Sequence, residues 1–148
     1  MSATISIHKI MSTKLVCVGL DDKLGMVKDI FDNMKFHHVL VVDEGKLLGV
    51  VSDRDLFKAL SPNMGTVHES EKDLACLNKR VHQIMTRGPV VLEENATVND
   101  AIHLFNTQGV SCLPVVDREG KPIGFVSWRD ILKNLRIRPT AQAATTSA

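Results

Sequence analysis

An internal repeat constrains the fold of this chain more than any local pattern does. The heptapeptide GVVSDRD at residues 49–55 returns as GFVSWRD at residues 124–130. Further upstream, HKIMS at residues 8–12 corresponds to HQIMT at residues 82–86. The offset between the copies is 74 residues before a short turn and 75 residues after it. A repeat of this period predicts two copies of one folding unit.

Each copy alternates short apolar runs, one amphipathic segment and turn residues. The run VLVV before DEGK at residues 43–46 predicts a strand and a hairpin turn. Apolar residues at helical spacing predict a helix before that strand and another after the heptapeptide. We therefore expect an α/β (α+β-like) fold, with each copy in the order strand, helix, strand, strand, helix. The expected boundaries are residues 7–60 for the first copy, 61–80 for a linker, 81–135 for the second copy and 136–148 for a flexible tail.

Two further expectations concern helix starts and the packing of the copies. Asp21 or Asp22 is expected to cap the first helix, and Asn95 or Thr97 its counterpart in the second copy. A unit of this size buries only a marginal core. A three-stranded sheet with two helices also leaves one sheet face uncovered. We therefore expect the copies to pack about a pseudo-twofold axis, with both heptapeptides facing a shared cleft.

Composition excludes several classes of protein. Of the 148 residues, 44% are hydrophobic and 24% are charged, as in soluble globular proteins. A net charge of +1 argues against nucleic-acid binding. No apolar run approaches the roughly 18–20 residues of a membrane span, and the N-terminus lacks the features of a signal peptide. The three cysteines, Cys17, Cys76 and Cys112, have no metal-ligand spacing, which predicts reduced thiols, no metal site and a cytoplasmic protein.

The heptapeptides combine groups that hold a nucleotide. In each, a serine ends a strand and an aspartate follows in the first helical turn, so a hydroxyl, free backbone N–H groups and a carboxylate meet. The same Ser-x-x-Asp spacing also indicates a capping box that needs no ligand. Both interpretations stay open for Ser52 with Asp55 and for Ser127 with Asp130.

These features resemble a tandem pair of CBS domains, also called a Bateman module. The resemblance rests on the heptapeptide pattern, on the Ile-Met pairs at residues 10–11 and 84–85, and on LPVVD at residues 113–117. The resemblance covers nearly the whole chain. Within the family, the chain is similar in particular to the small, stand-alone acetoin-utilisation accessory proteins. The resemblance implies an α/β fold with the copies side by side, and pairs that dimerise into a disc.

The resemblance also implies a regulatory function. Such modules sense adenosine-containing ligands, and we expect AMP, ADP or ATP first, with S-adenosylmethionine or NAD as alternatives. The implied partners are this nucleotide, a second copy in a homodimer and an unidentified regulated protein. No cofactor is required. The rival interpretation is a structural homodimerisation module without a ligand. We expect no enzyme, because the sequence shows no nucleophile with a recognisable base, no metal cluster and no P-loop.

The resemblance assigns roles to residues within the repeat. The aspartates that close the heptapeptides, Asp55 and Asp130, correspond to ribose-binding positions, since an ionised carboxylate accepts from two vicinal hydroxyl groups. The positions that correspond to phosphate-binding residues are Ser52, Arg54, Ser127, Arg129, His37 and His38. The positions that correspond to an adenine pocket are Val16, Val39, Val90 and Leu113, for which a place in the core is the alternative.

Alternatives remain for the charged positions. Arg54 is also consistent with a solvated side chain paired with Asp53 or a neighbouring glutamate. His37 and His38 point to opposite faces if they lie on a strand, which is also consistent with one exposed and one half-buried histidine. If they bind phosphate, affinity rises as pH falls through about 6.5. Trp128 replaces Asp53 in the second copy and removes a negative charge, so we expect better tolerance of a polyphosphate there.

Overall fold

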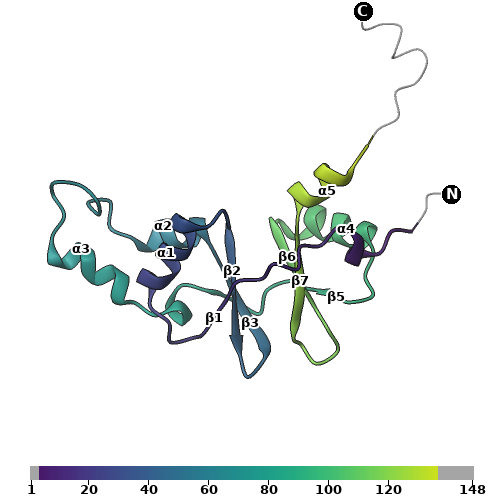
Figure 1. Cartoon of the computed structure of the whole chain (residues 1–148), viewed down its shortest axis with the longest axis horizontal. Helices are drawn as coiled ribbons and strands as arrows, with labels where there is room; N and C mark the ends of the chain where they lie inside the picture. Colours follow the sequence, from purple (N-terminus) through teal and green to yellow (C-terminus); the bar gives the residue numbers. More distant parts are fainter. Residues whose placement is uncertain (1–3, 137–148) are drawn as a thin grey trace, which may run out of the picture.

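Two similar halves lie side by side in the computed structural model, which describes residues 4–136 (Figure 1). The first half contains β1 (Cys17–Val18), α1 (Leu24–Asn33), β2 (His38–Asp43), β3 (Lys46–Ser52) and α2 (Asp53–Ala59). The second half contains β5 (Leu92–Glu93), α4 (Val98–Gln108), β6 (Cys112–Val116), β7 (Pro122–Ser127) and α5 (Trp128–Asn134). Both follow the predicted order strand, helix, strand, strand, helix, so the predicted α/β fold of two repeats is confirmed.

Turn chemistry builds the central hairpin of each half. Between β2 and β3, Glu44 and Gly45 have φ angles of 50° and 78°, the left-handed geometry that two-residue hairpin turns require. The turn between β6 and β7 is one residue longer. There the Oδ1 atom of Asp117 accepts hydrogen bonds from the backbone N–H groups of Glu119 and Lys121, each at 2.9 Å.

Helix starts follow the predicted caps in the second half and depart from them in α1. Thr97, and not Asn95, caps α4 through a capping box. The prediction of Asp21 or Asp22 as the cap of α1 is wrong. The N-cap residue is Lys23, whose side chain makes no capping hydrogen bond. The Oδ2 atom of Asp22 instead accepts from the N–H of Gly19 at 2.6 Å, which stabilises the preceding turn.

Short elements connect the halves and precede each of them. They are η1 (Ile7–Lys9), α3 (Glu71–Ala75), η2 (Cys76–Asn78), η3 (Val81–Gln83) and β4 (Thr86–Arg87). The linker, residues 61–80, extends from the first half on the side away from the second (Figure 1). Within it, α3 and η2 form a short helical segment with no buried residues. Residues 137–148 of the predicted tail lie outside the described part of the chain.

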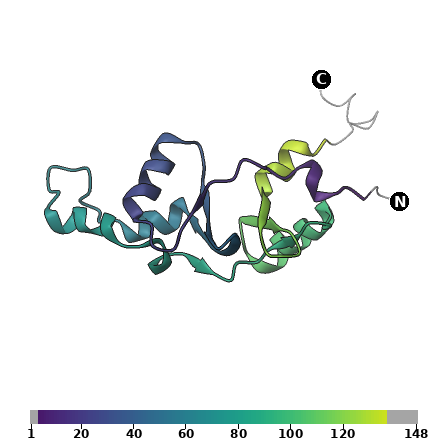
Figure 2. The same cartoon turned by 60° about the horizontal axis from the view of Figure 1, so that its bottom comes forward.

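The halves exchange their opening segments, which no local sequence pattern predicts. Ile7 has no exposed surface, lies in the core of the second half, and donates its N–H to the carbonyl of Ala96 at 2.9 Å. Val81 lies equally buried in the core of the first half and donates to the carbonyl of Asp22 at 2.8 Å. Figures 1 and 2 show the N-terminal segment beginning beside α4 and crossing to β1. Each core therefore depends on a segment of the other repeat.

The exchange also changes the sheets. β4 pairs antiparallel with β3, so the first sheet has four strands in the order β1-β2-β3-β4. The second sheet has three strands, β5-β6-β7, and Ser12 adds an isolated antiparallel bridge to Phe125. The expectation of a three-stranded sheet is therefore wrong for the first half, because the opening of the second repeat supplies the extra strand.

Candidate functional site

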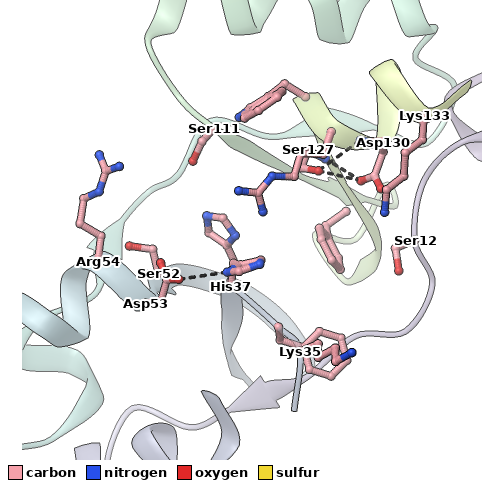
Figure 3. Close-up of a pocket in the computed structure, with 15 residues that line it drawn as sticks. Ser12, Lys35, His37, Ser52, Asp53, Arg54, Ser111, Ser127, Asp130 and Lys133 are labelled. Carbon is pink, nitrogen blue, oxygen red and sulfur yellow. Dashed lines mark hydrogen bonds and ion pairs between the residues drawn. The ribbon is translucent and has the colours of Figure 1, made fainter. Parts of the chain in front are cut away.

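A cleft of about 600 Å³ lies between the two halves (Figure 3). Both heptapeptides reach it, one at the junction of β3 and α2 and the other at the junction of β7 and α5. The connection between α1 and β2 forms a further part of the wall. The volume falls within the range of about 300–1,000 Å³ that is usual for small-molecule sites.

The cleft brings together most of the residues for which the sequence predicted a ligand role. All six predicted phosphate-binding residues line it: Ser52, Arg54, Ser127, Arg129, His37 and His38. Asp130 lines it as well, whereas Asp55 does not. The cleft also contains residues that were not predicted as site residues: Ser12, Lys35, Phe36, Asp53, Ser111, Phe125, Trp128 and Lys133.

Each heptapeptide forms a complete capping box. At α2, the Oγ atom of Ser52 accepts from the N–H of Asp55 at 3.0 Å, and the Oδ2 atom of Asp55 accepts from the N–H of Ser52 at 2.9 Å. At α5, the same pair of bonds joins Ser127 and Asp130 at 3.3 and 2.8 Å. The capping interpretation is therefore confirmed for both pairs. It is compatible with a ligand role for Asp130, which also faces the cleft.

Asp53 is paired with a histidine. Its Oδ2 atom lies 3.0 Å from Nδ1 of His37, and its backbone N–H donates to the carbonyl of His37 at 2.9 Å. Arg54 is exposed, as its alternative interpretation expected, but the expected pairing is wrong, because within residues 4–136 Arg54 forms no ion pair. On the other side of the cleft, the guanidinium of Arg129 lies 5.4 Å from the centre of the Trp128 ring, a cation–π contact.

The two adjacent histidines have different environments. His37 is exposed and His38 is half-buried, as one interpretation of the pair predicted. Burial lowers the pKa of His38 below its usual value of 6.5, although the carboxylate of Asp53 opposes this shift. His38 is therefore neutral near pH 7. For Asp53, burial raises the pKa, but the hydrogen bonds from His37 and from the backbone N–H of Arg54 outweigh it and hold the pKa below 3.8.

The residues predicted to contact adenine lie mainly in the cores. Val39 and Leu113 have no exposed surface and belong to the cores of the first and second half. Val16 and Val90 are partly buried against the same cores. None of the four is among the residues that line the cleft. Because Val39 and Leu113 have no accessible surface in this structure, their contact with adenine stays a prediction.

The half-buried thiol of Cys112 follows Ser111, which lines the cleft. Burial, and to a smaller extent the charge of Asp130, raises the pKa of Cys112 to about 12, so this thiol near the cleft carries no thiolate at neutral pH. No cluster of three or more metal-binding side chains occurs among residues 4–136. In the same part of the chain, no helix has the length and the apolar character needed to cross a membrane.

The two repeats match a known protein family. Residues 7–62 and 81–137 each match the CBS domain. The chain belongs to the CBS-domain family. It is 33% identical over 130 residues to a CBS domain-containing protein of Dictyostelium discoideum, covering 86% of this chain and 89% of that protein. It spans a smaller share of other relatives, such as 28% of an archaeal inosine-5'-monophosphate dehydrogenase.

Solved structures of other CBS-domain proteins share this fold. CBSX2, a CBS-pair protein of Arabidopsis thaliana, was solved in complex with AMP; it is 25% identical, with a TM-score of 0.71 over 87% of this chain and 94% of that chain. The cytosolic domain of the Mg²⁺ channel MgtE was solved in complex with ATP; it is 26% identical, with a TM-score of 0.70 over 88% of this chain and 49% of that chain. AcuB of Vibrio cholerae, assigned to acetoin utilization, shares the fold at 20% identity and a TM-score of 0.72, over 88% of this chain and 90% of that chain.

Proposed function

We propose that this CBS-domain pair is a regulatory module that binds an adenosine nucleotide, AMP, ADP or ATP, in the cleft and catalyses no reaction. The observation that carries the proposal is that both heptapeptides line one cleft of about 600 Å³ together with cationic side chains. The complexes of CBSX2 with AMP and of the MgtE cytosolic domain with ATP support this class of ligand. The ligand then changes how the module contacts a regulated protein.

The proposed roles follow the chemistry of the side chains. Asp130 binds the ribose, because its carboxylate faces the cleft and accepts from vicinal hydroxyl groups. Ser127 caps α5, and its single hydroxyl hydrogen, donated to Asp130 at 3.1 Å in this structure, turns to the ligand on binding. Arg129 supplies charge to the phosphates, since charge-assisted hydrogen bonds to phosphate are strong. At the first heptapeptide, Ser52 and His37 also line the cleft, where they can contact phosphate.

A matched pair of variants tests the binding function. Asp130→Asn removes a carboxylate from a capping box inside the cleft, and Asp100→Asn removes one from the capping box of α4, outside it. Thermal shift and calorimetry with AMP, ADP, ATP, NAD and S-adenosylmethionine measure binding. A ligand at about 100 times its Kd stabilises the native state by roughly 2.7 kcal/mol. We expect Asp130→Asn to lose this stabilisation and Asp100→Asn to retain it.

The same experiment separates the proposal from its rival. The capping boxes account for the serines and the aspartates without any ligand. If no compound of the panel binds the wild-type protein, the module is structural and the proposal is wrong. If NAD or S-adenosylmethionine binds and the nucleotides do not, the cleft binds a different adenosine ligand.

Homodimer formation is the second part of the proposal. Phe57 on α2 is 73% exposed and Leu132 on α5 is 56% exposed. These residues occupy equivalent positions in the two repeats, so the halves present matching apolar helix surfaces. Phe57→Asp and Leu132→Asp are expected to shift the protein toward monomer in analytical ultracentrifugation. Val67→Asp, at a linker residue that is 96% exposed, is the control. A wild-type monomer at all concentrations would contradict the proposal.

We place the protein in the cytoplasm, because its cysteines are unpaired. Cys17, Cys76 and Cys112 are all free thiols. Unpaired cysteines are typical of a reducing compartment. Expression of a fluorescent fusion of the full chain, followed by fractionation, tests this location.

A further inference from the structure

One position gives the two heptapeptides a different charge. The first residue of α2 is Asp53, and the corresponding residue of α5 is Trp128. Each precedes an arginine that also lines the cleft, Arg54 in the first half and Arg129 in the second. The first heptapeptide therefore carries two carboxylates and the second carries one, and of these Asp53 and Asp130 line the cleft.

The carboxylate of Asp53 is held at the cleft wall by two contacts with the same residue. Its Oδ2 atom lies 3.0 Å from Nδ1 of His37, and its backbone N–H donates to the His37 carbonyl at 2.9 Å. The Asp53 side chain is nevertheless 39% exposed. A ligand in the cleft therefore meets a positioned carboxylate rather than a freely moving surface residue.

This carboxylate is ionised at neutral pH. The hydrogen bonds that it accepts from His37 and from the Arg54 amide outweigh its burial and lower its pKa. The adjacent His38 does not neutralise it, because burial keeps that imidazole uncharged. A positioned carboxylate, hydrogen-bonded to His37, therefore borders the first part of the cleft.

On the opposite side of the cleft, the one lining carboxylate already belongs to a capping box. Figure 3 shows Asp53 and Arg54 on one side and Asp130, Lys133 and Ser12 on the other. There the Oδ2 atom of Asp130 already accepts the backbone N–H of its capping partner at 2.8 Å and a hydroxyl at 3.1 Å. Each side contributes two cations, Lys35 and Arg54 on the first and Arg129 and Lys133 on the second. The sides differ because Asp53 is a carboxylate outside the capping box, and its counterpart Trp128 is uncharged.

We propose that Asp53 determines ligand specificity by charge: its carboxylate repels multiply charged phosphates at the first heptapeptide, so a nucleotide binds with its phosphates toward Arg129 and Lys133. This inference rests on the proposed nucleotide-binding function and adds the orientation of the ligand. The Asp53 carboxylate also raises the ratio of AMP affinity to ATP affinity above the ratio expected without it. The repulsion grows with the number of phosphate charges and vanishes for adenosine.

The Asp53→Asn variant tests this role in the full chain. Calorimetry measures the affinity of the wild-type and variant proteins for ATP, AMP and adenosine. We expect the ATP affinity to rise on the order of tenfold and the AMP affinity about threefold, with adenosine unchanged. At about 0.5 M salt the gain for ATP shrinks, because mobile ions screen the repulsion.

Two further variants separate this effect from helix stability. Glu71→Gln removes a carboxylate from the first position of α3, directly after the cap Ser70, and lies outside the cleft. It removes the same type of interaction with the helix dipole and is expected to leave all three affinities unchanged. The reciprocal variant Trp128→Asp adds a carboxylate to the second heptapeptide. It is expected to lower the affinity for ATP more than the affinity for AMP.

The outcomes are distinguishable. If the wild-type protein binds ATP or AMP and Asp53→Asn leaves the ratio of their affinities unchanged, the charge role of Asp53 is wrong and the binding function stands. An equal gain for adenosine would also contradict the charge role, because adenosine carries no phosphate. If neither the wild-type protein nor Asp53→Asn binds any of the three compounds, both the inference and the binding function are wrong.

Discussion

Gly49 lies directly beneath the backbone of Thr86, so that a Cβ atom at Gly49 would come within 2.8 Å of the Thr86 carbonyl oxygen. The glycine that opens the first heptapeptide is therefore required by the exchanged segment, which pairs as β4 with β3 at this point. Gly124 has the corresponding place in the second half, where its Cβ would lie 2.6 Å from the sulfur of Met11. The methionine of the Ile-Met pair in one repeat thus packs against the heptapeptide glycine of the other.

Replacement of these glycines is expected to destabilise the fold. Gly49→Ala forces the Thr86 carbonyl to move and is expected to cost about 1–3 kcal/mol of unfolding free energy, as overpacked sites do. Gly124→Ala is expected to cost less, because the Met11 side chain can move and the Ser12 carbonyl lies farther away, at 3.1 Å. Chemical denaturation measures both. Gly25→Ala, where the nearest atoms are 3.6 Å away, is the control and is expected to be neutral or stabilising.

The exchange of segments predicts where a core mutation acts. Ile7 belongs to the first repeat in sequence but to the core of the second half, and Val81 shows the reverse. Ile7→Ala is expected to cost about 2–5 kcal/mol. It should reduce the hydrogen-exchange protection of β6 and β7 more than that of β2 and β3. Val81→Ala should reduce the hydrogen-exchange protection of β2 and β3 more than that of β6 and β7. Equal loss of protection in both halves for each variant would show that the cores are not separate units.

The order of elements could be predicted because its signals are local. Hydrophobic periodicity, the turn at residues 43–46 and the Ser-x-x-Asp caps each depend on neighbours in sequence. The exchange could not be predicted in the same way. The segments around Ile7 and Val81 are similar in sequence, so no local pattern states which core each one enters. Only the packing of the whole chain decides this.

The candidate site likewise contains residues that the local sequence predicts and residues that only the packing of the chain reveals. The heptapeptide residues were predicted to bind a ligand because they recur in the repeat. Lys35 and Lys133 were not predicted as site residues, because their approach to the cleft depends on how the halves pack. The contact of His37 with Asp53 depends on strand register: β2 and β3 align His38 with Ser52, which places the preceding and following residues together.

The lowered pKa of His38 predicts a pH dependence of stability. Between pH 6.5, the usual pKa of a histidine, and the lower pKa of native His38, the unfolded chain binds more protons than the native chain does. The contribution of His38 is therefore fully present above pH 6.5 and is lost as pH falls through its native pKa. The charged or titratable groups that act on this imidazole are Asp53, His37, Asp55 and Arg129.

Thermal unfolding between about pH 7.5 and 5.5 measures this effect. Wild-type Tm is expected to fall as the pH is lowered, and His38→Gln is expected to flatten the profile. His103→Gln, at an exposed histidine of α4 outside the cleft, is the control and should retain the wild-type profile. An unchanged slope in His38→Gln would show that other groups set the pH dependence.

Trp128 is expected to report ligand binding by its fluorescence. It is the only tryptophan of the chain, is 46% exposed and lines the cleft. The guanidinium of Arg129 lies 5.4 Å from its ring, so a phosphate that attracts Arg129 also changes the surroundings of the indole. Titration with ATP is therefore expected to change the intensity or the wavelength of emission with the same midpoint as calorimetry. Trp128→Phe should bind ATP without this signal. A saturating calorimetric titration with constant emission would show that the ligand lies away from Trp128 and would place it at the first heptapeptide.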